Sequence, residues 1–204
     1  YGCYEPLMVK KILENVRETD IVYDIGAHIG YYSSIFTSVT NSKEVVSIEP
    51  DFYSSNLIKR NTNERGIVVN KFIGSELGHN TTTLNDLSSM LSLEPSVIKM
   101  DIEGAEVEAF EGGWELIRNL RPQIFLEIHP KFIHKRNSKA FEKLVAELFK
   151  IYNMEYARNH WGPIKGKETF ESEWKKATPD IIFNIANDII FNDQRPNAFA
   201  MHCF

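Results

Sequence analysis

The chain has 204 residues, of which 43% are hydrophobic and 25% charged, and its formal net charge at pH 7 is −5. This length fits one domain with a full hydrophobic core, and the composition is that of a globular protein. The negative charge argues against general nucleic-acid binding, because neutralising phosphates requires clustered Lys and Arg. No stretch approaches the roughly 18 apolar residues of a membrane span, and the first residues lack a secretion-signal pattern. Nothing in the sequence predicts the oligomeric state.

The two cysteines, Cys3 and Cys203, stand near opposite ends of the chain and have no motif spacing. A bridge between them is one possibility, but no pattern supports it. A reducing, cytoplasmic setting is therefore the expectation.

Short β-branched runs alternate with segments of helical periodicity over most of the chain. This pattern predicts an α/β fold with a doubly wound, mostly parallel sheet and helices on both faces. The predicted strands are residues 21–25, 44–48, 67–73, 96–100 and 123–128. The predicted helices are residues 5–17, 30–39, 52–64, 103–119 and 138–152.

Several boundaries of these elements carry local signals. Asp51 can cap the helix that follows it, and the pair Gly112-Gly113 should bend or end the fourth helix. The basic stretch at residues 131–139 is interpreted as a solvated loop or as a patch facing the substrate. Lys99 is interpreted as a strand residue near an edge, as a snorkelling side chain, or as a paired lysine.

Beyond Tyr152 the pattern weakens. Residues 154–157 and 181–185 are predicted as two further strands, joined by a polar stretch at residues 159–179 that is a candidate loop over a site. We therefore expect one domain, with an N-terminal helix (1–20), a cofactor-binding core (21–152) and a C-terminal part on the acceptor side (153–204). Trp161 and Trp174 are interpreted as packing residues or as residues that close over the acceptor.

The first strand-to-helix turn reads Asp24-Ile-Gly26-Ala27-His28-Ile-Gly30. In doubly wound sheets, ligands bind at the carboxyl ends of the strands. The two glycines permit a sharp turn and a close approach. The loop does not match the Gly-x-Gly-x-x-Gly fingerprint for a dinucleotide, because an acid, Asp24, occupies the position of the first glycine. A carboxylate is a poor neighbour for a pyrophosphate and a good one for an ammonium group, such as that of S-adenosylmethionine.

A second acid, Glu49, ends the next predicted strand, 19 residues after Gly30, and is followed by Pro50. A carboxylate there can accept hydrogen bonds from both ribose hydroxyls. This suits NAD as well as S-adenosylmethionine, and Asp24 favours the second. The plainer alternative is that Asp24 caps a helix and that Glu49 is an exposed acid at the end of a strand.

These stretches resemble the FkbM-type family of S-adenosylmethionine-dependent methyltransferases. The resemblance covers residues 22–33, Ile48-Glu49-Pro50, residues 83–87, the run Ile98-Lys-Met-Asp-Ile-Glu-Gly-Ala-Glu106 and residues 121–129. It implies a seven-stranded Rossmann-like sheet whose last strand is antiparallel. It also implies methylation of hydroxyls on sugars or other small metabolites and glycans. The family commonly has Asn where this chain has His28, and a longer excursion where this chain has only residues 74–83.

Methyl transfer from a sulfonium requires alignment of the reactants and removal of a proton from the acceptor. The ends of the fourth and fifth predicted strands carry Asp101, Glu127 and His129. One interpretation makes His129 the general base, with a carboxylate orienting its other nitrogen. A second makes the three residues a divalent-metal site, and a third gives them only a structural role.

The predicted function is therefore an S-adenosylmethionine-dependent O-methyltransferase. The alternatives are a non-catalytic methyltransferase-like binding module and an NAD-dependent oxidoreductase. The predicted catalytic residues are His129, Asp101 and Glu127. The predicted contacts of the cofactor are Asp24, Gly26, Ala27, His28, Gly30, Glu49, Pro50, Ser75 and Asp101.

Overall fold

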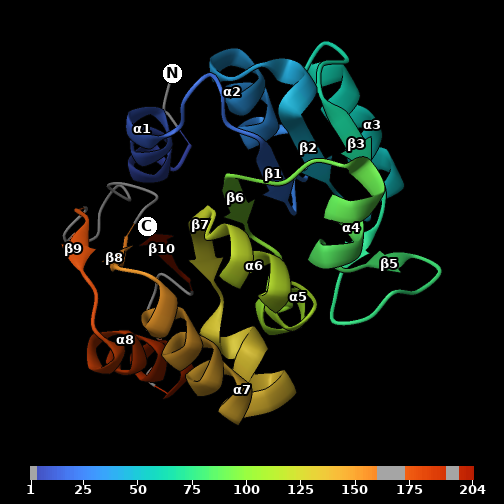
Figure 1. Cartoon of the computed structure of the whole chain (residues 1–204). Helices are drawn as coiled ribbons and strands as arrows, with labels where there is room; N and C mark the ends of the chain where they lie inside the picture. Colours follow the sequence, from blue (N-terminus) through green and yellow to red (C-terminus); the bar gives the residue numbers. More distant parts are fainter. Residues whose placement is uncertain (1–3, 160–172, 192–197) are drawn as a thin grey trace. The chain divides into compact units, whose positions relative to one another are not determined.

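The computed structural model describes residues 4–159, 173–191 and 198–204 (Figure 1). They form two compact units. We call Val16–Gln123 the central unit, and Tyr1–Asn15 together with Ile124–Phe204 the terminal unit. The single-domain organisation expected from the sequence remains a prediction. Within the described ranges, no helix combines the length and the apolar character needed to cross a membrane.

The central unit is built on four parallel strands in the order β3-β2-β1-β6, which run side by side in Figure 1. These are β1 (Val22–Ile25), β2 (Val45–Ile48), β3 (Ile67–Val69) and β6 (Val97–Met100). Every residue of β1, β2 and β6 is buried, as expected for strands with both faces covered. The helical elements are α2 (Tyr31–Val39), η1 (Ser42–Glu44), α3 (Phe52–Asn61), α4 (Leu84–Leu91), α5 (Glu106–Glu111) and α6 (Trp114–Leu120).

The predicted strand at residues 67–73 is two strands in the structure. A turn in which the Lys71 amide donates to the Val69 carbonyl (3.1 Å) ends β3. β4 (Phe72–Ile73) then pairs in parallel with β5 (Thr81–Thr82) in a separate small sheet. The apolar residues on both sides of Asn70-Lys71 concealed this turn.

The two helix-boundary signals of the central unit are confirmed. The Asp51 side chain accepts a hydrogen bond from the Ser54 amide (2.8 Å) and caps α3. Gly112 and Gly113 separate α5 from α6. A Cβ at position 112 would lie 2.1 Å from the Gly74 carbonyl oxygen, so only glycine fits there.

The terminal unit contains four strands in the order β7-β10-β8-β9. They are β7 (Gln123–Ile128), β8 (Met154–Ala157), β9 (Lys175–Lys176) and β10 (Phe199–Cys203), and the helices are α1 (Pro6–Asn15), α7 (Pro130–Ile151) and α8 (Pro179–Phe191). β10 is antiparallel to both β7 and β8. The implied antiparallel last strand is therefore confirmed.

The prediction of a strand at residues 181–185 is wrong. These residues lie in α8, whose buried Ile182, Ile185 and Ile189 recur at helical spacing, and α8 lies along α7 (Figure 1). A run of isoleucines does not distinguish a short strand from a buried helix. The last strand is instead β10, which the prediction missed because Phe-Ala-Met-His-Cys contains no β-branched residue.

The interpretation of residues 131–139 as a loop is also wrong. α7 begins at Pro130 rather than near residue 138, and Ile133 in its first turn is buried. Proline is well suited to the first position of a helix, because its missing N–H has no helical partner there. The basic residues therefore lie along a helix.

A buried histidine, His202 on β10, lies among aromatic and charged side chains of the terminal unit. Its ring stacks on Phe125 at a centroid distance of 4.8 Å. Glu155 of β8 lies 3.7 Å from its Nδ1 and is itself bonded to Lys11 of α1. Burial, reinforced by the Lys11 charge, lowers the pKa of His202 to about 4.

This histidine should make the terminal unit sensitive to acid. In an unfolded chain a histidine has a pKa of about 6.5, so between pH 6.5 and 4 the unfolded chain binds a proton that the folded chain does not. At pH 5 this should lower the free energy of unfolding by about 2 kcal/mol relative to pH 7.5.

The variant His202→Phe tests this prediction, because it keeps an aromatic ring and removes the titrating group. Urea unfolding at both pH values should show a smaller loss for this variant. The exposed His134 provides a matched control, since His134→Phe should behave like the wild type; an unchanged pH dependence in His202→Phe would contradict the assignment.

Candidate active site

The loop between β1 and α2 contains two glycines with positive φ, Gly26 (77°) and Gly30 (85°). A Cβ on Gly26 would lie 1.9 Å from the Asp101 carbonyl oxygen, and one on Gly30 would lie 3.0 Å from Ile58 Cα. Both glycines are therefore required by the close packing of the loop against the end of β6 and against α3. The sequence correctly marked the turn, and the structure supplies this additional reason for its glycines.

Glu49, at the end of β2, ties this loop to the start of α3. Its Oε2 accepts a hydrogen bond from the His28 amide (2.9 Å), and its Oε1 accepts one from the Asp51 amide (2.8 Å). The residue is only 8% exposed. Each carboxylate oxygen can accept a second hydrogen bond, so Glu49 can hold the loop and still bind a pair of ribose hydroxyls.

His28 has a left-handed backbone conformation, with φ of 48°, and an exposed side chain. Asn and His are both among the residues that occupy this region more often than most. The departure from the family's usual asparagine is thus compatible with the backbone. The hydrogen bond from His28 to Glu49 is donated by the backbone amide of His28 and not by its ring.

Asp24 lies in β1 and is fully buried. Its Oδ2 accepts a hydrogen bond from the Ser33 hydroxyl at 2.6 Å. Its Oδ1 is buried and has no hydrogen-bond partner within the described part of the chain. Burial raises the pKa of this carboxyl, while the Lys99 charge and the Ser33 hydroxyl oppose the rise. A buried acceptor without a donor is costly, so the site fits an incoming ammonium group.

At the end of β6, Lys99 and Asp101 form an ion pair, with Lys99 Nζ 3.6 Å from Asp101 Oδ2. Lys99 is only 2% exposed, and its Nζ lies 4.5 Å from the centroid of the Tyr32 ring. The interpretations of Lys99 as a residue near an edge or as a snorkelling side chain are therefore wrong, and the paired lysine is correct. Asp101 is half-buried and retains some exposure.

At the end of β7, Glu127 and His129 face each other. His129 Nε2 lies 3.6 Å from Glu127 Oε1, and both side chains are largely buried. His129 is also the residue that immediately precedes α7. Asp101 belongs to the central unit and this pair to the terminal unit, so the interpretation of the three residues as a metal site stays one of the alternatives.

The remaining predicted residues differ in exposure. Ser75 is exposed and lies between β4 and β5, Pro50 is half-buried, and Ala27 is buried. Trp174 donates a hydrogen bond from Nε1 to the Leu7 carbonyl (3.4 Å), so it packs on α1. Trp161 and Cys3 lie outside the described residues. The possibility of a bridge between Cys3 and the buried Cys203 therefore also falls outside the described residues.

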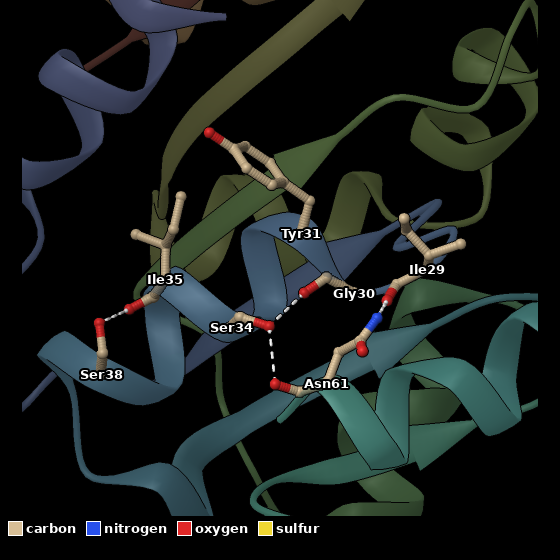
Figure 2. Close-up of a pocket in the computed structure, with 7 residues that line it drawn as sticks. All are labelled: Ile29, Gly30, Tyr31, Ser34, Ile35, Ser38 and Asn61. Carbon is tan, nitrogen blue, oxygen red and sulfur yellow. Dashed lines mark hydrogen bonds between the residues drawn. The ribbon is translucent and has the colours of Figure 1, made fainter. Parts of the chain in front are cut away.

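A shallow pocket of about 380 Å³ lies beside the loop (Figure 2). Its lining comes from the end of the loop, the outer side of α2 and the end of α3: Ile29, Gly30, Tyr31, Ser34, Ile35, Ser38 and Asn61. The Asn61 side chain donates to the Ile29 carbonyl (2.7 Å), and the Ser34 hydroxyl donates to the Gly30 carbonyl (2.7 Å). The Ser34 hydroxyl also lies 3.2 Å from the Asn61 carbonyl oxygen, so the contacts of Asn61 hold the end of the loop and the start of α2 against α3. Gly30 is the only predicted cofactor residue in this lining.

Comparison with known proteins shows which family this chain resembles. Residues 72–157 match the methyltransferase FkbM domain. The resemblance to FkbM-type methyltransferases is therefore confirmed. The chain is 22% identical over 182 residues to the hexuronic acid methyltransferase AglP of Haloferax volcanii, with 71% of each chain covered.

Solved structures of FkbM-type and other methyltransferases show the same fold. Methyltransferase FkbM from Methylobacillus flagellatus matches 93% of this chain with a TM-score of 0.58 and 16% identity. This chain spans only 44% of that protein. A SAM-dependent O-methyltransferase from Thermotoga maritima matches 98% of this chain, which spans 63% of it, with a TM-score of 0.54 and 11% identity. The predicted Rossmann-like methyltransferase fold is thus confirmed.

Proposed function

We propose that this protein is an S-adenosylmethionine-dependent methyltransferase that methylates a hydroxyl of a sugar, glycan or small metabolite. The observation that carries the cofactor assignment is the buried Asp24, whose Oδ1 lacks a donor among the described residues. Glu49 adds a second carboxylate at the end of the neighbouring strand β2. Two acids at adjacent strand ends suit an ammonium and a ribose diol, and they disfavour a pyrophosphate.

Several residues of this chain would bind the cofactor, each at a different part of it. Asp24 would hold the ammonium, Glu49 the ribose hydroxyls, and the backbone from Gly26 to Gly30 the wall of the cofactor site. Pro50, Ser75 and Asp101 would complete the contacts. The cofactor would supply an electrophilic methyl group on a sulfonium.

On the acceptor side, His129 would take the proton that the acceptor hydroxyl loses and would become an imidazolium. Glu127, 3.6 Å from His129 Nε2, would orient the ring and stabilise the imidazolium. Asp101, at the end of β6, is assigned to the reacting end of the cofactor site.

A sugar acceptor is supported by the similarity to a protein named for hexuronic acid methylation. A net charge of −5 makes a polyanionic acceptor such as a nucleic acid an unfavourable partner. We place the enzyme in the cytoplasm, where S-adenosylmethionine is made.

Calorimetric titration with S-adenosylhomocysteine is the first test of this function. The protein should bind it in the micromolar range and should bind NADH far more weakly; the reverse order would support the oxidoreductase alternative. Radiolabelled S-adenosylmethionine with a panel of hexuronic acids, neutral sugars and phenols should then label a sugar hydroxyl. Cofactor binding without transfer to any acceptor would favour a non-catalytic binding module.

A further inference from the structure

A row of buried polar side chains crosses the centre of the parallel sheet. In the strand register, Asp24 of β1 is paired with Ser47 of β2 on one side and with Lys99 of β6 on the other. Register partners in a parallel sheet project to the same face. All three side chains are at most 2% exposed. A polar row in the middle of an otherwise apolar sheet is costly unless its members satisfy one another.

Helix α2 covers this row and connects its members. The Ser47 hydroxyl donates to the Ser33 hydroxyl (2.8 Å), and Ser33 in turn donates to Asp24 Oδ2 (2.6 Å). Tyr32, which precedes Ser33 in α2, contacts Lys99, whose Nζ lies 4.5 Å from the centroid of the Tyr32 ring. The hydroxyl chain therefore occupies Oδ2 of Asp24 and leaves Oδ1 as the oxygen without a partner among the described residues.

We propose that Ser33, Ser47 and Lys99 are positioning residues that keep Asp24 ionised and present its Oδ1 to the ammonium of the cofactor. This inference rests on the proposed function. None of the three residues was among the site residues predicted from the sequence. They act through Asp24, since the hydroxyls orient the carboxylate and Lys99 supplies the compensating charge.

The charged groups that act on Asp24 have opposing effects. Burial raises the pKa of Asp24, the charge of Asp101 raises it further, and Lys99 and the Ser33 hydroxyl lower it. Removing the Ser33 hydroxyl should therefore raise it. A protonated Asp24 attracts an ammonium weakly, so the affinity for the cofactor should decrease as the pH is lowered. In the Ser33→Ala variant this loss of affinity should begin at a higher pH.

The test is the pH dependence of S-adenosylhomocysteine binding, measured by calorimetry between pH 5 and 8. In Ser33→Ala the acid-side loss of affinity should move to higher pH by about one unit, the shift expected for losing a hydrogen bond to a charged group. Ser47→Ala leaves the bond between Ser33 and Asp24 in place and should shift the curve less, in the same direction. Lys99→Met should shift it further. Ser38→Ala is a matched control, because Ser38 lies on the same helix, is exposed, and donates to the Ile35 carbonyl instead of to Asp24.

A parallel measurement separates this inference from the proposed function. Carbon-13 NMR of the cofactor-free protein can follow the Asp24 carboxyl, identified as the signal lost in Asp24→Asn. Its titration midpoint should rise in Ser33→Ala and stay constant in Ser38→Ala. Failure of the wild type to bind S-adenosylhomocysteine would overturn the proposed function, while a shifted NMR midpoint would still uphold the positioning role. An unshifted midpoint, or an equal loss of affinity at every pH, would overturn the positioning role.

Discussion

Replacing His129 by alanine should lower methyl transfer by about 100- to 10,000-fold, the usual contribution of a positioned general base. Binding of S-adenosylhomocysteine should remain within a few-fold of the wild type, because the residues assigned to the cofactor lie on other strands. Glu127→Gln should cause a smaller loss, since its Oε1 lies 3.6 Å from His129 Nε2 and its proposed role is to orient that ring. Single-turnover kinetics and calorimetry together measure both effects.

His134→Ala is the matched control for His129. His134 is exposed on α7, where its ring meets Phe191, and its removal should leave turnover unchanged. A loss of cofactor affinity equal to the loss of turnover in His129→Ala would contradict the assignment. Activity that disappears on chelation and returns with Mg²⁺ would favour the metal interpretation of Asp101, Glu127 and His129 instead.

Asp24→Asn should weaken S-adenosylhomocysteine binding by about 1.5–3 kcal/mol, or roughly 10- to 150-fold, the cost of losing a hydrogen bond to a charged group. The variant keeps the size of the side chain and an oxygen that can accept from Ser33, so its unfolding should stay close to that of the wild type. Calorimetry at pH 8, with urea unfolding alongside, separates the two effects.

Asp20→Asn is the matched control for Asp24. Asp20 lies before the opposite end of β1, where its carboxylate accepts from the Arg17 amide and the Ser96 hydroxyl at 2.7 Å each. Its removal should not change cofactor affinity. Asp24→Asn with wild-type affinity would refute the ammonium contact and return Asp24 to a purely structural role.

Part of the candidate site could be read directly from short stretches of sequence. The turn after β1, the acid that ends β2, the cap at Asp51 and the break at Gly112 all follow from local rules on φ, capping and strand ends. These signals are local because each depends on a backbone conformation or on a hydrogen bond to a residue a few positions away. They were therefore sufficient to place Asp24 and Glu49 at neighbouring strand ends.

The roles of other residues depended on contacts between distant segments. The sequence left three interpretations of Lys99 open, because its burial follows from the pairing of β6 with β1. Ser33 and Ser47 are ordinary serines until the fold brings α2 onto the sheet. The Asp101 carbonyl, which excludes a side chain at Gly26, likewise comes from 75 positions further along the chain.

The sequence by itself determined the fold class, the glycine turn after β1 and the positions of the two acids, because these depend on local patterns that a single segment carries. Only the tertiary structure decided that residues 181–185 are helical, that residues 199–203 form the antiparallel strand, and that Asp24 lies in a buried row with Ser47 and Lys99. Those outcomes are set by which surfaces become buried against each other. Hydrophobic residues of similar type can form a helix or a strand until that packing selects one of them.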